Sequence, residues 1–158
     1  MKISRSSFVQ EYIDYQILLL EHLNKSSKIE LPKIVFSSDN KKSSIIKDSH
    51  GFNRSVRLMS WIDGRLWSSV NPITKLLRYE LGYSCSELSK SLQGFKHSYA
   101  DREIEWDIAK SLWVESHIDK FDTRELKILK KIIKNFKDNL HLYNKLEKSI
   151  IHLSLIHI

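Results

Sequence analysis

The chain has 158 residues, of which 41% are hydrophobic, 28% charged and 10% aromatic, as in an ordinary globular protein. Four glycines and two prolines are too few for a collagen-like or linker-type protein, and the single cysteine, Cys85, excludes a disulfide framework and a cysteine-rich zinc site. The longest apolar run, Ile17–Leu20, is too short to span a membrane, and no signal peptide is recognised. We therefore expect a cytoplasmic protein without membrane contact, of a length typical of one domain.

Positive charge dominates, with 26 Lys and Arg against 19 Asp and Glu and a formal net charge of +7. The basic residues are spread along the chain, and their densest run, residues 127–137, alternates with core-type residues. That alternation is typical of the solvated face of a helix, and a surface that follows phosphates is the alternative. The charge by itself identifies no partner, and we expect no nucleic acid to be bound.

The first part of the chain predicts one helix followed by a small sheet. Apolar residues step by three or four from Phe8 to Leu23, as on one face of a helix. Residues 31–36 predict a short strand, with Pro32 near its start. Turn-forming residues at 48–51 separate Ile45-Ile46 from the apolar run 52–61, which predicts an antiparallel hairpin that ends before Asp63-Gly64.

The second part of the chain predicts only helices. One begins near Thr74 and ends before Gly94, a second carries Ile104, Ile108 and Leu112, and a third is capped by Asp122-Thr123. We expect residues 74–140 to form a helical unit packed on Leu77, Leu81, Leu88, Leu126, Leu129, Ile133 and Phe136. The fold class is therefore α+β. A sheet this small cannot bury both of its faces with one helix, so either the helical part covers it or strands are missing before Met1, and we expect missing strands.

The last residues, 153–158, fit no predicted element, and they match the translation of a transposase mosaic-end adapter used in preparing sequencing libraries. We expect this tail to be non-native, so that the natural sequence is represented only as far as His152. An ordinary apolar C-terminal strand is the alternative.

Four segments are similar to motifs of the aminoglycoside phosphotransferase-type kinases, and nearest to the hydroxylysine kinase branch of that superfamily. Residues 1–4 resemble the end of the strand that carries the nucleotide-binding lysine, and Asp14-Tyr15-Gln16 resembles the start of a helix signature, with Ile17 in place of its asparagine. Residues 56–64 resemble the strand and hinge that lead into the adenine site, and 149–152 resemble the strand before the catalytic loop. Phe95-Lys96-His97 gives a further match.

This resemblance implies an incomplete protein-kinase-like bilobal fold. Residues 1–64 would be a partial N-lobe with one helix and the hinge, and residues 65–152 a partial helical C-lobe. The complete enzyme would use ATP and Mg²⁺ to phosphorylate a hydroxyl group on an amino-acid-like or amino-alcohol substrate, and some members are fused to a class III aminotransferase. We expect the present chain to be inactive by itself. The alternative from another class is a basic helical interaction module that binds nucleic acid or a protein partner.

The resemblance also implies roles for single residues. Lys2 would contact the nucleotide phosphates, and Gln16, where most of the superfamily has glutamate, would hold Lys2 more weakly than a charged group does. Backbone groups of Ser60, Trp61 and Ile62 would bind adenine, between the apolar side chains of Met59 and Trp61; core packing of these two side chains is the alternative.

The remaining functional assignments are supported by fewer features of the sequence. Glu105, Trp106 and Asp107 could attract an amine-bearing substrate, although a capping carboxylate beside a core tryptophan fits the same residues. His152 would open the catalytic loop, but Leu153-Ser154 follows it in place of Asn-Asp, and no catalytic residue is assigned. The histidines show no metal-ligand spacing, so no metal site is predicted in the protein itself.

Overall fold

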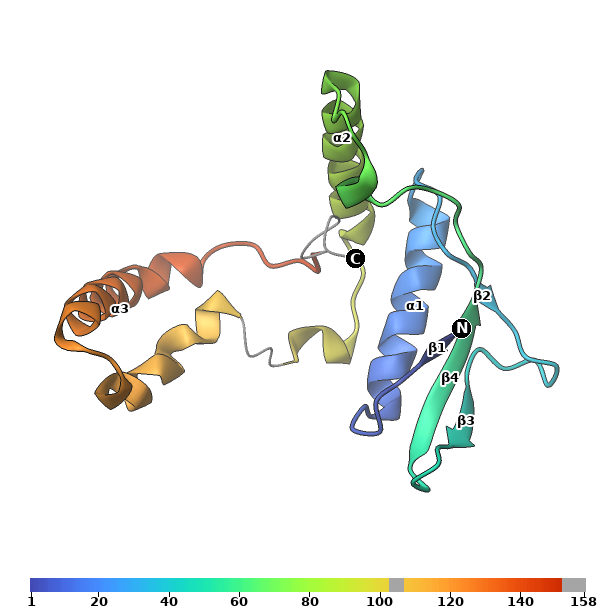
Figure 1. Ribbon diagram of the computed structural model, residues 1–158, viewed down its shortest axis with the longest axis horizontal. Coiled ribbons are helices and arrows are strands. Elements are labelled where there is room, and N and C mark those ends of the chain that lie inside the picture. Colours follow the sequence, from blue (N-terminus) through green and yellow to red (C-terminus); the bar gives the residue numbers. More distant parts are fainter. Residues whose placement is uncertain (103–106, 152–158) are drawn as a thin grey trace. The chain divides into compact units, whose positions relative to one another are not determined.

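The computed structural model describes residues 1–102 and 107–151, which form two compact units (Figure 1). Of the described residues, the first unit contains 1–100 and 149–151, and the second contains 101–102 and 107–148. The first unit contains a small antiparallel sheet and two long helices, and the second contains helices. The predicted mixed α+β class is confirmed at this level, and the kinase-like bilobal arrangement stays a prediction.

The sheet is built around its longest strand, β4. Its members are β1 (Lys2–Ile3), β2 (Ile34–Val35), β3 (Ser44–Lys47) and β4 (Asn53–Met59), and the first three each pair antiparallel with β4. Lys2 lies opposite Arg57, and Ile34 lies opposite Met59. β2 is shorter than the predicted strand, because Pro32 has no N–H to donate and the chain turns away at Ser37.

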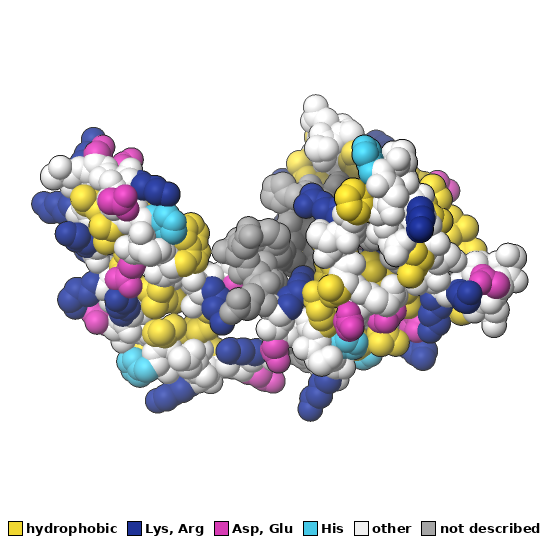
Figure 2. All heavy atoms as spheres, turned by 90° about the horizontal axis from the view of Figure 1, so that it is seen from below, with side chains coloured by type: hydrophobic (Ala, Val, Ile, Leu, Met, Phe, Trp, Pro, Cys, Tyr) yellow, Lys and Arg dark blue, Asp and Glu magenta, His cyan; other side chains and the backbone are white. Residues whose placement is uncertain are grey.

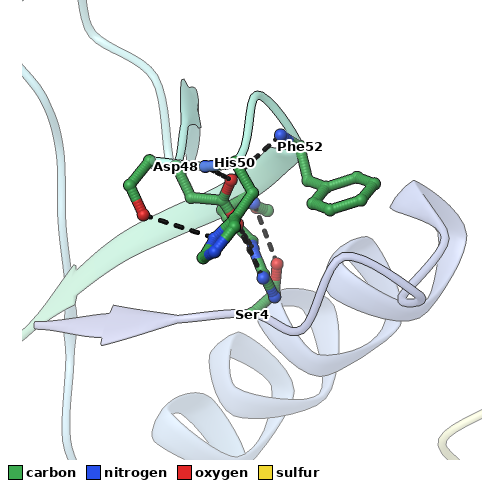
Figure 3. Close-up of polar contacts among 7 residues, drawn as sticks. Ser4, Asp48, His50 and Phe52 are labelled. Atoms are coloured by element: carbon green, nitrogen blue, oxygen red, sulfur yellow. Dashed lines mark hydrogen bonds and ion pairs between the residues drawn. The ribbon is translucent and has the colours of Figure 1, made fainter.

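The predicted hairpin is confirmed, with Lys47 opposite Asn53 in the pairing of β3 with β4. Asp48 closes the turn, as Figure 3 shows: its Oδ1 accepts from the backbone N–H groups of His50 at 2.9 Å and Phe52 at 3.0 Å. Its Oδ2 binds the Arg54 guanidinium at 2.7 Å. Gly51 adopts φ +80°, a conformation that few other residues tolerate, so the turn residues of the sequence determine the hairpin locally.

Helix α1 (Gln10–Ser26) carries most of the core of the first unit, with Ile13, Tyr15, Ile17 and Leu23 buried. Helix α2 (Lys75–Leu92) packs against it through a cluster of Leu23, Leu88 and Leu92. The two helices are also joined by polar contacts: His22 Nε2 lies 2.8 Å from the carbonyl oxygen of Ser91. The predicted start of α2 is confirmed, because the Thr74 hydroxyl accepts from the backbone N–H of Leu77.

In the second unit, the 3₁₀ helix η3 (Ile108–Lys120) contacts helix α3 (Thr123–Tyr143). The predicted cap of α3 is confirmed in full. Asp122 accepts from the N–H groups of Arg124 and Glu125, and the Glu125 side chain accepts from the N–H of Asp122, which completes a capping box. The predicted second helix is 3₁₀ in the described residues, with a kink at His117. Two further 3₁₀ segments, which begin within residues 1–100, are η1 (Trp67–Ser69) and η2 (Ser98–Asp101).

The structure differs from the single helical unit expected over 74–140. Helix α2 belongs to the first unit and α3 to the second. The physical reason is that the C-terminal end of α2 packs on α1: Leu88 and Leu92 are buried there, with Leu19 packed beside them. Among the residues expected in a shared core, only Leu88 and Ile133 are buried, each in its own unit.

Candidate functional site

The strand that carries Lys2 is held along the strand that leads into the predicted hinge. Besides the pairing of Lys2 with Arg57, the backbone N–H of Ser4 donates to the carbonyl oxygen of Ser55 at 2.8 Å. The Ser4 hydroxyl in turn accepts from the N–H of Ser55 at 2.9 Å (Figure 3). These contacts place a strand of two residues in a defined register despite its position at the chain end.

Helix α1 presents Gln16 to this strand pair, but Gln16 is hydrogen-bonded to Arg57 and not to Lys2, the predicted partner. The side-chain oxygen of Gln16 accepts a hydrogen bond from Arg57 Nη2. No hydrogen bond joins Lys2 to Gln16, both of which the structure describes. The sequence analysis assigned no role to Arg57, which lies opposite Lys2 in the sheet and binds Gln16.

A cavity of about 310 Å³ lies where β1, α1 and β4 meet. It brings together the two predicted phosphate-site residues, Lys2 and Gln16. The residues that line it are Lys2, Ile3, Ser4, Arg5, Phe8, Tyr12, Ile13, Gln16, Ser55 and Arg57. The lining thus combines three cationic side chains with serine and tyrosine hydroxyls, and it contains no carboxylate, so its electrostatic potential favours an anion.

Burial and mutual repulsion act on the cations of this cavity. Partial burial of the ammonium, followed by the positive charge of Arg57, lowers the pKa of Lys2. Burial also lowers the pKa of Arg57, against a smaller opposing effect of Tyr12. The Arg57 guanidinium stays protonated at neutral pH because arginine starts from so high a pKa.

The predicted hinge follows β4 directly. Met59 is the last residue of that strand and is half-buried, and Ile62 is half-buried as well. The N–H of Ser60 donates to the carbonyl oxygen of Lys33 at 2.8 Å, and the Ser60 hydroxyl accepts from the N–H of Lys33. Trp61 is 86% exposed, so the alternative that it belongs to the core is wrong. No hinge residue lines the cavity between β1, α1 and β4.

The residues predicted to contact substrate are placed only in part. Asp107 caps η3, its Oδ1 accepting from the N–H of Ala109 at 2.9 Å, which fits the capping alternative. Glu105, Trp106 and His152 lie outside the described residues. Phe95 and His97, from the further match, lie in the first unit beside Tyr15, with ring centroids 6.2 and 5.3 Å from the Tyr15 ring. The structure therefore assigns these two rings to packing on α1.

Other site types receive little support from the described parts of the chain. No cluster of three or more histidine, cysteine, aspartate or glutamate side chains is placed there to hold a metal ion. No helix within residues 1–102 or 107–151 is long and apolar enough to cross a membrane. A second cavity, of about 230 Å³, lies in the second unit between η3 and α3, where Lys134 and Lys137 pair with Asp138 and Glu115.

The basic side chains form no single patch on the face drawn in Figure 2, where they are mixed with acidic and hydrophobic groups. The ion pairs of Lys134 and Lys137 show that part of the densest basic run of the sequence is already matched by carboxylates. This pattern is that of a solvated helix face.

Comparison with known proteins identifies no relative of the chain: it matches no family model, no curated protein and no solved structure. The functional assignment therefore depends on the cavity between β1, α1 and β4 and on the motifs of the sequence.

Proposed function

We propose that this chain is the nucleotide-binding part of an ATP-dependent small-molecule kinase. The observation that carries the proposal is the cavity in which β1, α1 and β4 bring Lys2, Gln16 and Arg57 together. Phosphoryl transfer depends chiefly on positioning the phosphates and neutralising their charge, and a strand lysine beside a helix is a common way to do so. The same β4 continues into the hinge at Ser60.

In this proposal, Lys2 reaches the phosphates of ATP from the edge of the sheet, where its ammonium is partly exposed. The adenine ring is bound by the backbone of Trp61 and Ile62, since the N–H of Ser60 already donates to Lys33. The exposed Trp61 indole is free to cover one face of the base. Mg²⁺ would neutralise the β- and γ-phosphates when bound, and the acceptor would be a hydroxyl group on an amino alcohol or amino acid.

The 158 residues contain no aspartate after Asp138, so neither a catalytic aspartate nor a metal-binding aspartate follows His152. We therefore expect calorimetry of this chain with Mg-ATP to show weak binding and no turnover. Tight binding would contradict the assignment of the metal ligands to residues beyond these 158.

The decisive measurement is made on the genomic reading frame that continues past the His152 codon. We expect it to encode Asn-Asp and, later, a further acidic motif. Its product should consume ATP in the presence of a hydroxylated amino acid or an amino alcohol. Lys2→Ala in that product should reduce turnover strongly, while Lys28→Ala, at an exposed position of the first unit, should not. Equal turnover with and without the Lys2 ammonium would overturn the proposal.

A further inference from the structure

Arg57 is an unusual group to find in the interior of the first unit. Its side chain comes from β4 and its residue is 7% exposed, yet no carboxylate is placed against it among the residues lining the cavity. Nη2 donates to the Gln16 amide oxygen, while Nη1 is buried and has no hydrogen-bond partner in the described structure. A buried cationic N–H without an acceptor is strongly unfavourable, which indicates that an acceptor from outside the chain belongs there.

The surroundings of Arg57 specify the charge of that acceptor. Lys2 lies opposite Arg57 in the sheet, and Arg5 lines the same cavity. Positive groups held this close together in a partly buried site repel one another, so a bound anion would relieve both the repulsion and the unsatisfied N–H. The cavity, at about 310 Å³, is larger than a single ordered water requires.

The charge and number of the donors fit a phosphate, which brings about two negative charges and three acceptor oxygens to one site. A guanidinium offers parallel N–H groups that match two oxygens of one phosphate, and an ammonium adds a compact point charge beside them. The N–H of Ser55 already donates to the Ser4 hydroxyl oxygen, so the charged donors of the cavity are the cations, with the Ser4 O–H as a neutral donor beside them.

We propose that Arg57 is a phosphate-binding residue that forms, with Lys2, a two-cation site for phosphate oxygens. Gln16 acts as the positioning residue of Arg57 and not as the partner of Lys2. The nucleotide is the source of the phosphate if the proposed kinase function holds, and this part of the inference rests on that function. Free inorganic phosphate shares the same chemistry and would use the same donors.

The proposal gives a reason for a neutral glutamine at position 16. A glutamate there would pair with Arg57 and compete with the phosphate for the guanidinium, whereas the amide oxygen of Gln16 orients Arg57 without cancelling its charge. Gln16→Glu therefore tests the proposal directly, because it adds a negative charge at position 16 while nearly preserving the shape of the side chain.

The experiment is a titration of the 158-residue chain, followed by ¹H–¹⁵N NMR in phosphate-free buffer without Mg²⁺. Inorganic phosphate, pyrophosphate and ATP are added in separate arms, and the Arg57 side-chain N–H signals and the Ser55 amide are observed. We expect weak binding, with a Kd on the order of 1 mM for pyrophosphate. Arg57→Gln and Lys2→Gln should each weaken it about tenfold, as the loss of a charge-assisted hydrogen bond does.

Arg54→Gln is the matched control, because Arg54 lies on the same strand and is bound by Asp48 outside the cavity. It removes the same charge and should leave the Kd unchanged. Gln16→Glu should weaken pyrophosphate binding while raising the thermal stability of the ligand-free chain, since the new carboxylate pairs with Arg57. A purely structural role for Arg57 would change stability without this opposite change in binding.

The outcomes separate this inference from the proposed function. Equal binding of ATP and pyrophosphate, weakened by Arg57→Gln, supports the phosphate site and removes the adenine site. Binding of ATP that depends on Lys2 but is unaffected by both Arg57→Gln and Gln16→Glu overturns the role of Arg57 and leaves the kinase proposal standing. No shift in the Arg57 or Ser55 signals with any of the three ligands overturns the phosphate site. If Arg57→Gln does not fold, Lys2→Gln and Gln16→Glu decide the same question.

Discussion

In the first unit, α1 contacts both the sheet and α2 and buries four hydrophobic side chains, whereas in the second unit α3 buries only Ile133 among the described residues. The capping signals at the helix N-termini rank these two helices in the opposite order. α3 has a complete capping box, while the residue before α1, Val9, provides no side-chain cap. A complete N-terminal cap therefore does not imply that a helix is well buried, because capping acts within one turn and burial needs a partner distant in sequence.

The largest expected effect is in the packed first unit. Leu88→Ala removes a buried side chain from the contact of α2 with Leu23 of α1, and we expect a loss of about 2–5 kcal/mol in the free energy of unfolding. Leu76→Ala, on the same helix but 67% exposed, is the control and should cost well under that. Urea unfolding followed by circular dichroism measures both. Equal losses would mean that α2 is not packed on α1.

A substitution in the second unit should have a smaller and more local effect. Leu129 is half-buried on α3, so Leu129→Asn is expected to cost about 1–2 kcal/mol, part of the value of a fully buried leucine. Hydrogen exchange should become faster in α3 and stay unchanged in α1. An unchanged melting temperature together with unchanged exchange would show that this face of α3 is not packed.

The capping box should contribute about as much to the free energy of unfolding as one half-buried side chain does. Asp122→Ala leaves the N–H groups of Arg124 and Glu125 without their acceptor, and we expect a cost of about 1 kcal/mol. Asp119→Ala, an exposed position of η3, is the matched control. Amide exchange in the first turn of α3 reports the difference. If both variants behave alike, long-range packing rather than the cap determines where α3 begins.

The smallest effect concerns the β3–β4 turn at low pH. Burial raises the pKa of Asp48, but hydrogen bonds from Arg54, Phe52 and His50 outweigh it and lower the pKa of this carboxyl below that of an ordinary aspartate. A carboxylate whose pKa is depressed by folding stabilises the hairpin above its unfolded pKa, and this contribution is lost as the pH falls through the folded value.

The amide signals of His50 and Phe52 should therefore titrate together at a pH below the ordinary aspartate pKa, and Asp48→Asn should abolish this titration. Titration of these amides at or above the ordinary aspartate value would show that the turn does not hold the charged form.

Much of the fold was predicted from sequence because its signals are local. The Asp48–Gly51 turn, the Thr74 cap of α2 and the Asp122 cap of α3 each act over a few residues, and all are present in the structure. The helix that contains Gln16 was predicted from its apolar periodicity, which is also a local signal. The strand at Lys2 was located only through motif resemblance, since a lysine second in the chain has no local signal of its own.

The sequence by itself determined where the helices and the hairpin form, because caps, turns and apolar periodicity are properties of neighbouring residues. Only the tertiary structure decided which helix α2 packs on, and which cation Gln16 holds. Both depend on partners far apart in sequence: Leu23 of α1 meets Leu88 of α2, and Gln16 of α1 meets Arg57 of β4. Arg57 carries no signal in the sequence, because its importance comes from burial next to Lys2, and burial is decided by what the rest of the chain places over it.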